Sequence, residues 1–103
     1  MNTFSIVAEP SRRRILDALV TGPRPVGELV EELGMSQPVV SKHLRILRDA
    51  DVVTVTPSGQ RRLYAVNPAP LKEIHTWLEP YRRFWDGKLD DLEAHLAAEK
   101  NND

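Results

Sequence analysis

Residues 26–47 read VGELVEELGMSQPVVSKHLRIL and contain the most informative pattern of the chain. In its first half, apolar side chains recur at positions i, i+3, i+4 and i+7, which predicts a two-turn helix over 26–33. Gly34 is typical of a helix C-terminus, and Ser36 is a good N-cap for a second helix that runs to about Ala50. Two short helices joined by so tight a turn are typical of a helix-turn-helix motif.

The second helix, over 36–50, has an apolar stripe with Leu44 at its centre and a polar face opposite. That polar face contains no acidic residue before Asp49. It suits the major groove of DNA, because glutamine can pair with adenine, arginine or lysine with guanine, and serine with a base or a phosphate. The side chains expected to meet DNA are those of Ser36, Gln37, Pro38, Ser41, Lys42 and Arg45. On composition alone, an ordinary solvated helix face is the alternative.

A basic β-hairpin is predicted directly after this helix. Residues 52–56 are β-branched throughout, residues 61–66 form a second strand-like run, and the four residues between them form a turn. The hairpin tip over 57–62 carries Gln60, Arg61 and Arg62, which are expected to reach the flanking phosphates or the minor groove. A helix-turn-helix followed by such a wing predicts a winged helix, in a chain that is mainly α with one small β-hairpin.

Further helices are predicted on both sides of this unit. Pro10 precedes a helix over 11–20, because proline is favoured at the start of a helix. After the hairpin, a helix is expected to open at Leu71, and Pro80 is expected to restart or kink it. Its apolar residues keep helical spacing, so we expect the helix to continue to about Glu99.

Four of the six aromatic residues fall within nine positions of this last helix. A single helix cannot bury them all on one narrow stripe, and aromatic side chains are favoured in interfaces, so we expect a homodimer. The expected interface comprises Phe4, Ile6, Trp77, Tyr81, Phe84, Trp85, Leu89 and Leu92. The alternative is that these residues cover the back of the chain's own core.

The 103 residues are enough for one domain, which is expected over 1–100 and is followed by a frayed tail over 101–103. The chain shows no export signal and no apolar run long enough to span a membrane, so we expect a cytoplasmic protein without a membrane partner. The net charge of −1 hides an uneven distribution. Residues 35–66 carry five Lys or Arg and two Asp, whereas residues 86–103 carry two Lys and six Asp or Glu.

Nothing in the sequence indicates an enzyme or a metal centre. It lacks a P-loop, a glycine-rich dinucleotide turn and the HExxH and GxSxG motifs. There is no cysteine, which excludes disulfides and thiolate ligands. His43, His75 and His95 are too widely spaced to form a short-range ligand pair, so no metal and no cofactor are expected. An intersubunit site that uses His75 or His95 stays open.

Residues 8–16 (AEPSRRRIL), 26–29 and 33–47 carry a resemblance to ArsR/SmtB-type repressors, which covers the chain from Phe4 to about Leu96. The resemblance implies a homodimeric winged-helix repressor in which the first and last helices pair the subunits. It implies that Gln37, Pro38, Ser41 and Lys42 occupy the positions that meet bases and phosphates. Two recognition helices about one DNA turn apart, roughly 34 Å, imply an inverted repeat as target.

The lack of cysteine separates this chain from the metal sensors of that family, which bind metals through cysteines or through Asp and His pairs near the C-terminus. Cysteine-free members often repress their own small operons, and the resemblance implies the same here. The switch stays open between an unidentified small organic effector, a partner protein and protein concentration. The alternative function is a winged helix used for protein contacts without DNA binding, which has no need for Lys42, Arg45, Arg61 and Arg62 all on one side.

Overall fold

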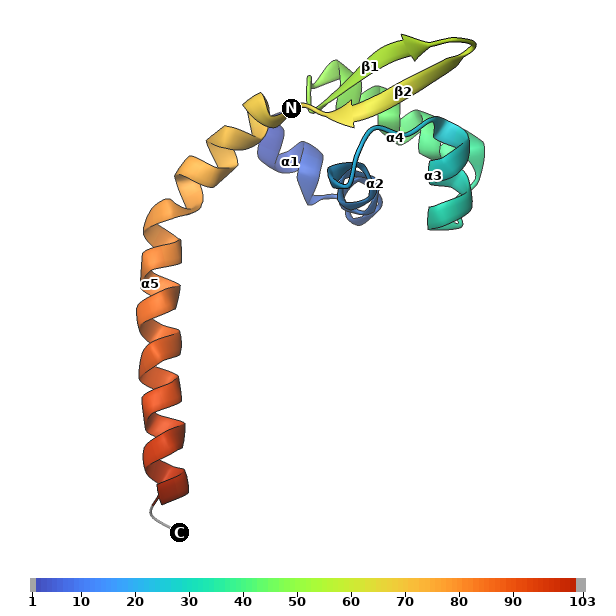
Figure 1. Ribbon diagram of the computed structural model, residues 1–103. Helices are drawn as coiled ribbons and strands as arrows, with labels where there is room; N and C mark the ends of the chain where they lie inside the picture. The colour runs from blue at the N-terminus through green and yellow to red at the C-terminus, as the bar shows by residue number, and fades with distance from the viewer. Residues whose placement is uncertain (1, 102–103) are drawn as a thin grey trace. The chain divides into compact units, whose positions relative to one another are not determined.

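The described residues, 2–101, form helices and one antiparallel β-hairpin in the computed structural model (Figure 1). In chain order the elements are α1 (Thr3–Ala8), α2 (Pro10–Val20), α3 (Val26–Leu33), α4 (Gln37–Asp49), β1 (Val53–Ser58), β2 (Arg61–Val66) and α5 (Pro68–Asn101). The chain divides into two units, one up to Glu73 and the other from Ile74. The prediction of a mainly helical chain with one small hairpin is confirmed.

The helix-turn-helix forms where the sequence predicts it. α3 ends at Gly34, whose φ of 66° lies in the left-handed region that glycine adopts without strain. The Gly34 N–H donates to the Val30 carbonyl at 3.0 Å. The Ser36 hydroxyl then caps α4 by accepting a hydrogen bond from the Val39 N–H at 3.4 Å. These two caps set the direction in which α4 leaves the turn.

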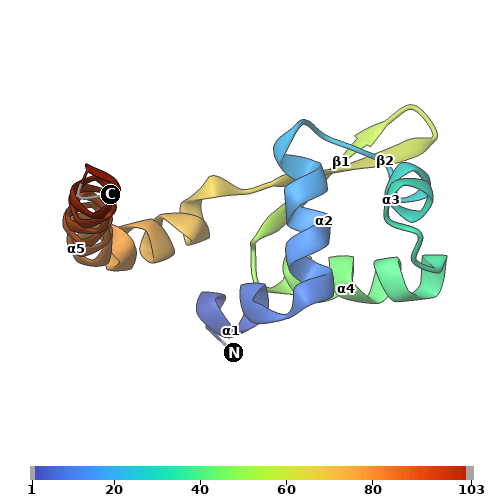
Figure 2. The ribbon, with the colours of Figure 1, turned by 90° about the horizontal axis from the view of Figure 1, so that it is seen from below.

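α2 is the central helix of the first unit and runs from α4 toward the hairpin (Figure 2). Its apolar face packs with residues of α3, α4 and the start of β1 in one hydrophobic cluster. The side chains buried most completely are those of Ile15, Leu29, Val40, Leu44, Leu47, Val52 and Val53. Each such burial stabilises the fold by about 1.5–3 kcal/mol, so this cluster holds the helix-turn-helix and the hairpin on α2.

The sequence does not predict α1, because six residues are too few to reveal a helical period. The Asn2 side chain caps it by accepting a hydrogen bond from the Ser5 N–H at 2.9 Å. Ile6 is only 3% exposed and belongs to the core of its own chain, although the sequence analysis expects it at a dimer interface. A side chain buried in this way leaves almost no area for a partner.

Glu9 and Arg12 hold the junction between α1 and α2. The Glu9 carboxylate caps α2 by accepting a hydrogen bond from the Arg12 N–H at 2.9 Å, and this bond lowers the pKa of the Glu9 carboxyl below its ordinary value. The Arg12 guanidinium donates to the Ile6 carbonyl at 2.6 Å. Arg14 donates to the carbonyl of Leu33, the last residue of α3, at 2.9 Å. Two of the three adjacent arginines therefore bind carbonyls at helix ends.

α5 begins at Pro68 rather than at Leu71. Proline is tolerated in the first turn of a helix, because the N–H groups there have no intrahelical acceptor. The Asn67 side chain accepts a hydrogen bond from the Ala69 N–H at 3.3 Å and so satisfies one of these donors. Within the first unit, Leu71 packs against the core.

The helix then continues through Pro80 and Gly87 to Asn101, so Pro80 does not end it. Residues 102 and 103 of the expected frayed tail lie outside the described residues. None of the described helices is long and apolar enough to cross a membrane.

The hairpin is longer than the sequence analysis expects, because β1 extends through Pro57 to Ser58. Pro57 lies opposite Arg62 and Ser58 opposite Arg61. Proline is tolerated there because β1 is an edge strand with a partner on one side only. The missing N–H of proline therefore interrupts no second row of hydrogen bonds. The turn is thus reduced to Gly59 and Gln60, with a φ of 62° at Gly59.

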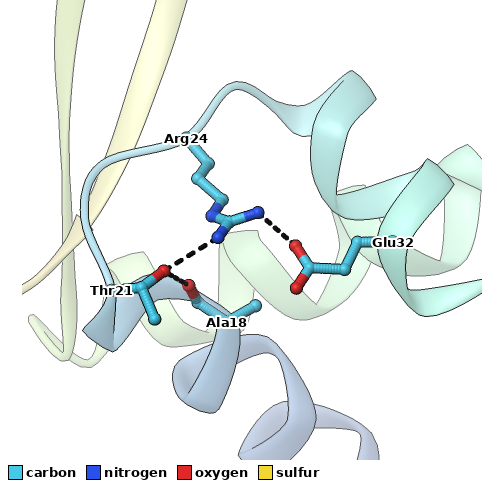
Figure 3. Close-up of polar contacts among 4 residues, drawn as sticks. All are labelled: Ala18, Thr21, Arg24 and Glu32. Atoms are coloured by element: carbon cyan, nitrogen blue, oxygen red, sulfur yellow. Dashed lines mark hydrogen bonds and ion pairs between the residues drawn. The ribbon is translucent and has the colours of Figure 1, made fainter.

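Arg24 connects the wing to the helix-turn-helix (Figure 3). Its backbone N–H and carbonyl both pair with Tyr64 of β2, each at 2.9 Å. Its guanidinium donates to the Thr21 hydroxyl at 2.8 Å and forms an ion pair with Glu32 of α3. The Thr21 hydroxyl donates in turn to the Ala18 carbonyl at 2.9 Å. One residue therefore connects three elements: its backbone pairs with β2, and its side chain contacts the end of α2 and α3.

Arg24→Ala is expected to lower the free energy of unfolding by about 1 kcal/mol, because it removes a hydrogen bond and an ion pair that are only partly exposed. In a double-mutant cycle with Glu32→Ala, urea denaturation should give a coupling of about 0.5–1 kcal/mol. Arg13→Ala, at an exposed position of α2, is the matched control and should change stability by less than about 0.5 kcal/mol. Strictly additive effects of Arg24→Ala and Glu32→Ala would contradict the brace.

Asp51 adopts a conformation that favours glycine. Its φ is 61°, which side chains other than Asn and Asp rarely tolerate. Its N–H donates to the Arg48 carbonyl and the Val52 N–H donates to the Leu47 carbonyl, each at 2.9 Å. These bonds close the end of α4 and hold Asp51 in the left-handed region.

Asp51→Gly is expected to raise the free energy of unfolding by about 0.5–1 kcal/mol, because glycine removes the steric cost of the left-handed conformation. Asp49→Gly, inside the last turn of α4, is the control and should lower it by up to about 1 kcal/mol. Chemical denaturation of both variants measures the difference. A loss of stability in Asp51→Gly would show that the aspartate side chain stabilises this turn.

Candidate nucleic-acid interface

α4 presents the predicted polar face to solvent. Ser36, Gln37, Pro38, Ser41, Lys42 and Arg45 are all exposed. On the opposite face, Val40 and Leu47 are fully buried and Leu44 is 1% exposed. The helix therefore cannot turn its polar face inward without exposing its aliphatic anchors, and this face is free to enter a groove of DNA.

The wing residues are exposed as well. Gln60 lies in the two-residue turn, and Arg61 and Arg62 begin β2. The hairpin tip lies on the α3 side of the first unit (Figure 2), where Gln60, Arg61 and Arg62 line a surface hollow together with residues of α3. Because neighbouring strand residues point to opposite faces, Arg61 and Arg62 serve different sides of the wing, and Arg62 shares its side with Tyr64.

The cations of α4 and of the wing have no anionic partner within the described part of the chain. The ion pairs found there join Arg24 with Glu32 and Arg83 with Glu79, and the imidazoles of His43 and His95 lie near the carboxylates of Glu9 and Glu99. None of these involves Lys42, Arg45, Arg61 or Arg62. An exposed cationic surface without internal compensation is typical of proteins that bind phosphate-rich polymers.

Arg48 is a further exposed cation that the sequence analysis does not select. Arg48 lies seven positions after Ser41 and three positions after Arg45, so the three residues share one helical stripe. This spacing is the signal that could have found it. Its position places it on the same side of α4 as two of the expected DNA-binding residues.

His43 lies at the edge of the buried face of α4. Its side chain is 16% exposed, and Nδ1 lies 3.9 Å from Glu9 Oε2 without a hydrogen-bond partner among the described residues. His43 therefore contributes to packing between α4 and the start of α2 rather than to the exposed polar face. Within residues 2–101 no group of three His, Asp or Glu side chains is arranged to hold a metal ion.

The second unit consists of the helical segment after Glu73, and its apolar stripe is exposed. Trp77, Tyr81, Phe84, Trp85, Leu89, Leu92 and Leu96 are each between 46% and 59% exposed. Two local contacts order the aromatic rings: the Trp77 and Tyr81 centroids lie 4.9 Å apart, and Lys88 Nζ lies 5.5 Å from the Phe84 centroid. Most of the expected interface residues thus form one exposed stripe, while Phe4 is half-buried on α1.

A family model of bacterial regulatory proteins of the arsR family matches residues 9–55, which span α2 to the first half of β1. The HTH-type transcriptional regulator Rv2034 of Mycobacterium tuberculosis is 42% identical over 86 residues, covering 84% of this chain and 78% of that protein. The transcriptional repressor SdpR of Bacillus subtilis is 35% identical over 77 residues, covering 75% of this chain and 86% of that protein. The crystal structure of an ArsR family transcriptional regulator matches with a TM-score of 0.66 at 30% identity, covering 81% of this chain and 86% of that one.

The relatives match this chain in sequence, and the solved structure matches it in fold. The chain belongs to the arsR family of bacterial regulatory proteins, which are winged-helix transcriptional regulators and not enzymes.

Proposed function

We propose that this chain is a cytoplasmic, homodimeric repressor that binds an inverted repeat in double-stranded DNA. The observation that carries the proposal is the exposed face of α4, where Lys42 and Arg45 lack an anionic partner among the described residues and stand beside Gln37 and Ser41. These side chains offer the donors and acceptors that read base edges in the major groove.

The two parts of the interface have different tasks. The base contacts come from three residues of α4: Gln37, Ser41 and Lys42. Ser36 caps this helix, and its hydroxyl and the backbone N–H groups of the first helical turn suit a phosphate. Gln60, Arg61 and Arg62 on the wing bind the flanking backbone. Specificity therefore comes from α4, and the wing adds affinity that depends on salt concentration.

A second copy of the chain is the partner that fits the stripe on α5. Its apolar residues repeat with a period of eleven, so that Leu78, Tyr81 and Trp85 are followed by Leu89, Leu92 and Leu96. This period matches a nearly straight helix or one with a slight right-handed supercoil. It keeps these apolar residues in one continuous row along the helix, which forms an apolar seam. A seam of this kind is self-complementary, and two-fold pairing places two recognition helices on an inverted repeat.

The regulatory signal does not use thiolate chemistry, because the chain contains no cysteine. We propose repression of the chain's own operon, with derepression either by a small organic effector at the aromatic stripe or by a fall in protein concentration. The relative from Bacillus subtilis, which is named a transcriptional repressor, supports repression rather than activation.

Fluorescence anisotropy tests the function directly. DNA from the region upstream of the gene and a scrambled fragment are titrated with protein between about 50 and 200 mM salt. We expect binding at least about 1,000-fold tighter to the native fragment, with steep salt dependence. Equal and weak binding to both fragments would favour the alternative, a winged helix used for protein contacts.

Variants separate the roles of α4 and the wing in the same assay. Lys42→Ala is expected to weaken binding and to change base preference, because it removes a contact in the groove. Arg62→Ala is expected to weaken binding to all sequences equally and to reduce the salt slope by about one, because it removes a phosphate contact. If both variants bind like the wild type, neither residue contacts DNA.

Leu89→Glu is expected to make the protein monomeric, because it places a carboxylate in the middle of the apolar seam. Sedimentation equilibrium measures the mass, and operator affinity should fall at least about 100-fold when two half-sites no longer bind together. Ala94→Glu is the matched control. Ala94 follows Trp85 by nine positions, and at about 100° per residue it lies on the side of α5 opposite the apolar seam. A dimeric Leu89→Glu variant would place the interface elsewhere.

A further inference from the structure

A hollow of about 250 Å³ lies between the exposed side of α4 and β2. Its polar lining comes from two elements that are distant in sequence. The residues are Ser41, Arg45, Arg48 and Asp49 on α4, and Arg62 and Tyr64 on β2. The buried side chain of Leu44 closes its floor.

Tertiary packing brings these side chains together. Positions 41, 45 and 48 form one stripe of α4, and positions 62 and 64 share one face of β2. α4 packs on β1, which pairs with β2 along its whole length. The backbone bonds between Arg24 and Tyr64 hold the other edge of β2. The hollow is therefore a built feature between two anchored elements.

The charge of the hollow is unbalanced. Three guanidinium groups face one carboxylate, and no ion pair or side-chain hydrogen bond among the described residues engages Arg45, Arg48 or Arg62. Like charges so placed repel one another unless an anion lies between them. The carbonyls of residues 46–48 at the end of α4 already accept hydrogen bonds from the N–H groups of residues 50–52. These carbonyl oxygens are therefore not left unpaired to repel a bound anion.

A phosphate group fits this lining chemically. Guanidinium groups bind phosphate oxygens in bidentate fashion, and the hydroxyls of Ser41 and Tyr64 add neutral donors. The hollow lies between α4, which is proposed to enter the major groove, and the wing, which is proposed to bind the flanking backbone, so a DNA phosphate between these two contacts fits its position.

We propose that the hollow is a subsite for one backbone phosphodiester of bound DNA, with Arg48 and Tyr64 as phosphate-binding residues; this rests on the proposed DNA-binding function. Ser41 and Arg45, which the proposed function counts among the base-reading side chains, also line the hollow and lie within reach of the same phosphate. The subsite links the base-reading helix to the wing through a single phosphate.

The first test compares salt slopes on the operator. Arg48→Ala is expected to weaken binding about tenfold, to reduce the salt slope by about one and to leave the ratio of specific to scrambled binding unchanged. Asp49→Asn is expected to tighten binding a few-fold, because it removes the one carboxylate of the hollow. Lys72→Ala, which removes an exposed cation outside the hollow, is the control and should leave the slope unchanged. An unchanged slope in Arg48→Ala, with specific binding by the wild type, overturns the subsite and leaves the function standing.

The second test neutralises single phosphates of the operator with methylphosphonates. One position should weaken wild-type binding but leave the binding of Arg48→Ala unaffected, because the contact is already lost. Equal effects on both proteins at every position overturn the proposal.

The third test uses the free protein and inorganic phosphate at constant ionic strength. The Arg48 side-chain Nε–Hε NMR signal should shift with phosphate and not with chloride, and the signal of Arg82 on α5 should stay. If phosphate shifts the Arg48 signal but Arg48→Ala leaves the salt slope of DNA binding unchanged, the hollow binds free phosphate. Its assignment to a DNA phosphate is then overturned. If the wild type fails to bind DNA specifically, the proposed function fails, and this arm alone then tests whether the hollow binds phosphate.

Discussion

Val40, Leu44 and Leu47 fix the orientation of α4, because each is almost completely buried in the core built around α2. Their burial contributes several kcal/mol in total, which is more than any single polar contact on the surface of the helix supplies. A turn of α4 by one residue would expose one of these side chains and bury an amide or a cation. The polar face is therefore held outward by the apolar face, and the candidate interface depends on the core beneath it.

The position of the wing depends on a second set of contacts. Pairing of β1 with β2 alone makes a two-stranded ribbon, which is only marginally stable by itself. The backbone bonds of Arg24 to Tyr64 add a second contact, on the edge of β2 that β1 leaves free, and the Arg24 side chain connects it to the end of α2 and to α3. The wing and the recognition helix thus belong to one braced unit, and the hollow between them keeps a defined shape.

Two exposed features of the described chain are left unsatisfied by its own residues. The cations of α4 and the wing lack anionic partners there, and the apolar stripe of α5 remains about half exposed. The first feature requires a polyanion and the second requires apolar surface. In the proposed function, DNA and a second copy of the chain meet these requirements together, since a two-fold dimer would present α4 twice to one duplex.

Local sequence patterns suffice to predict the helix-turn-helix, the outward face of α4 and the hairpin, because periodicity, caps and turn residues act over a few neighbouring positions. The same local patterns explain where prediction from the sequence fails. α1 is too short to show a helical period, and the prolines at 57 and 68 do not end their elements, because proline is tolerated in an edge strand and in a first helical turn. The long-range packing of the elements places Ile6 in the core, lets Arg24 brace the wing and brings Arg48 to the same hollow as Arg62 and Tyr64. Those outcomes depend on how elements distant in sequence pack together, and no local pattern encodes that packing.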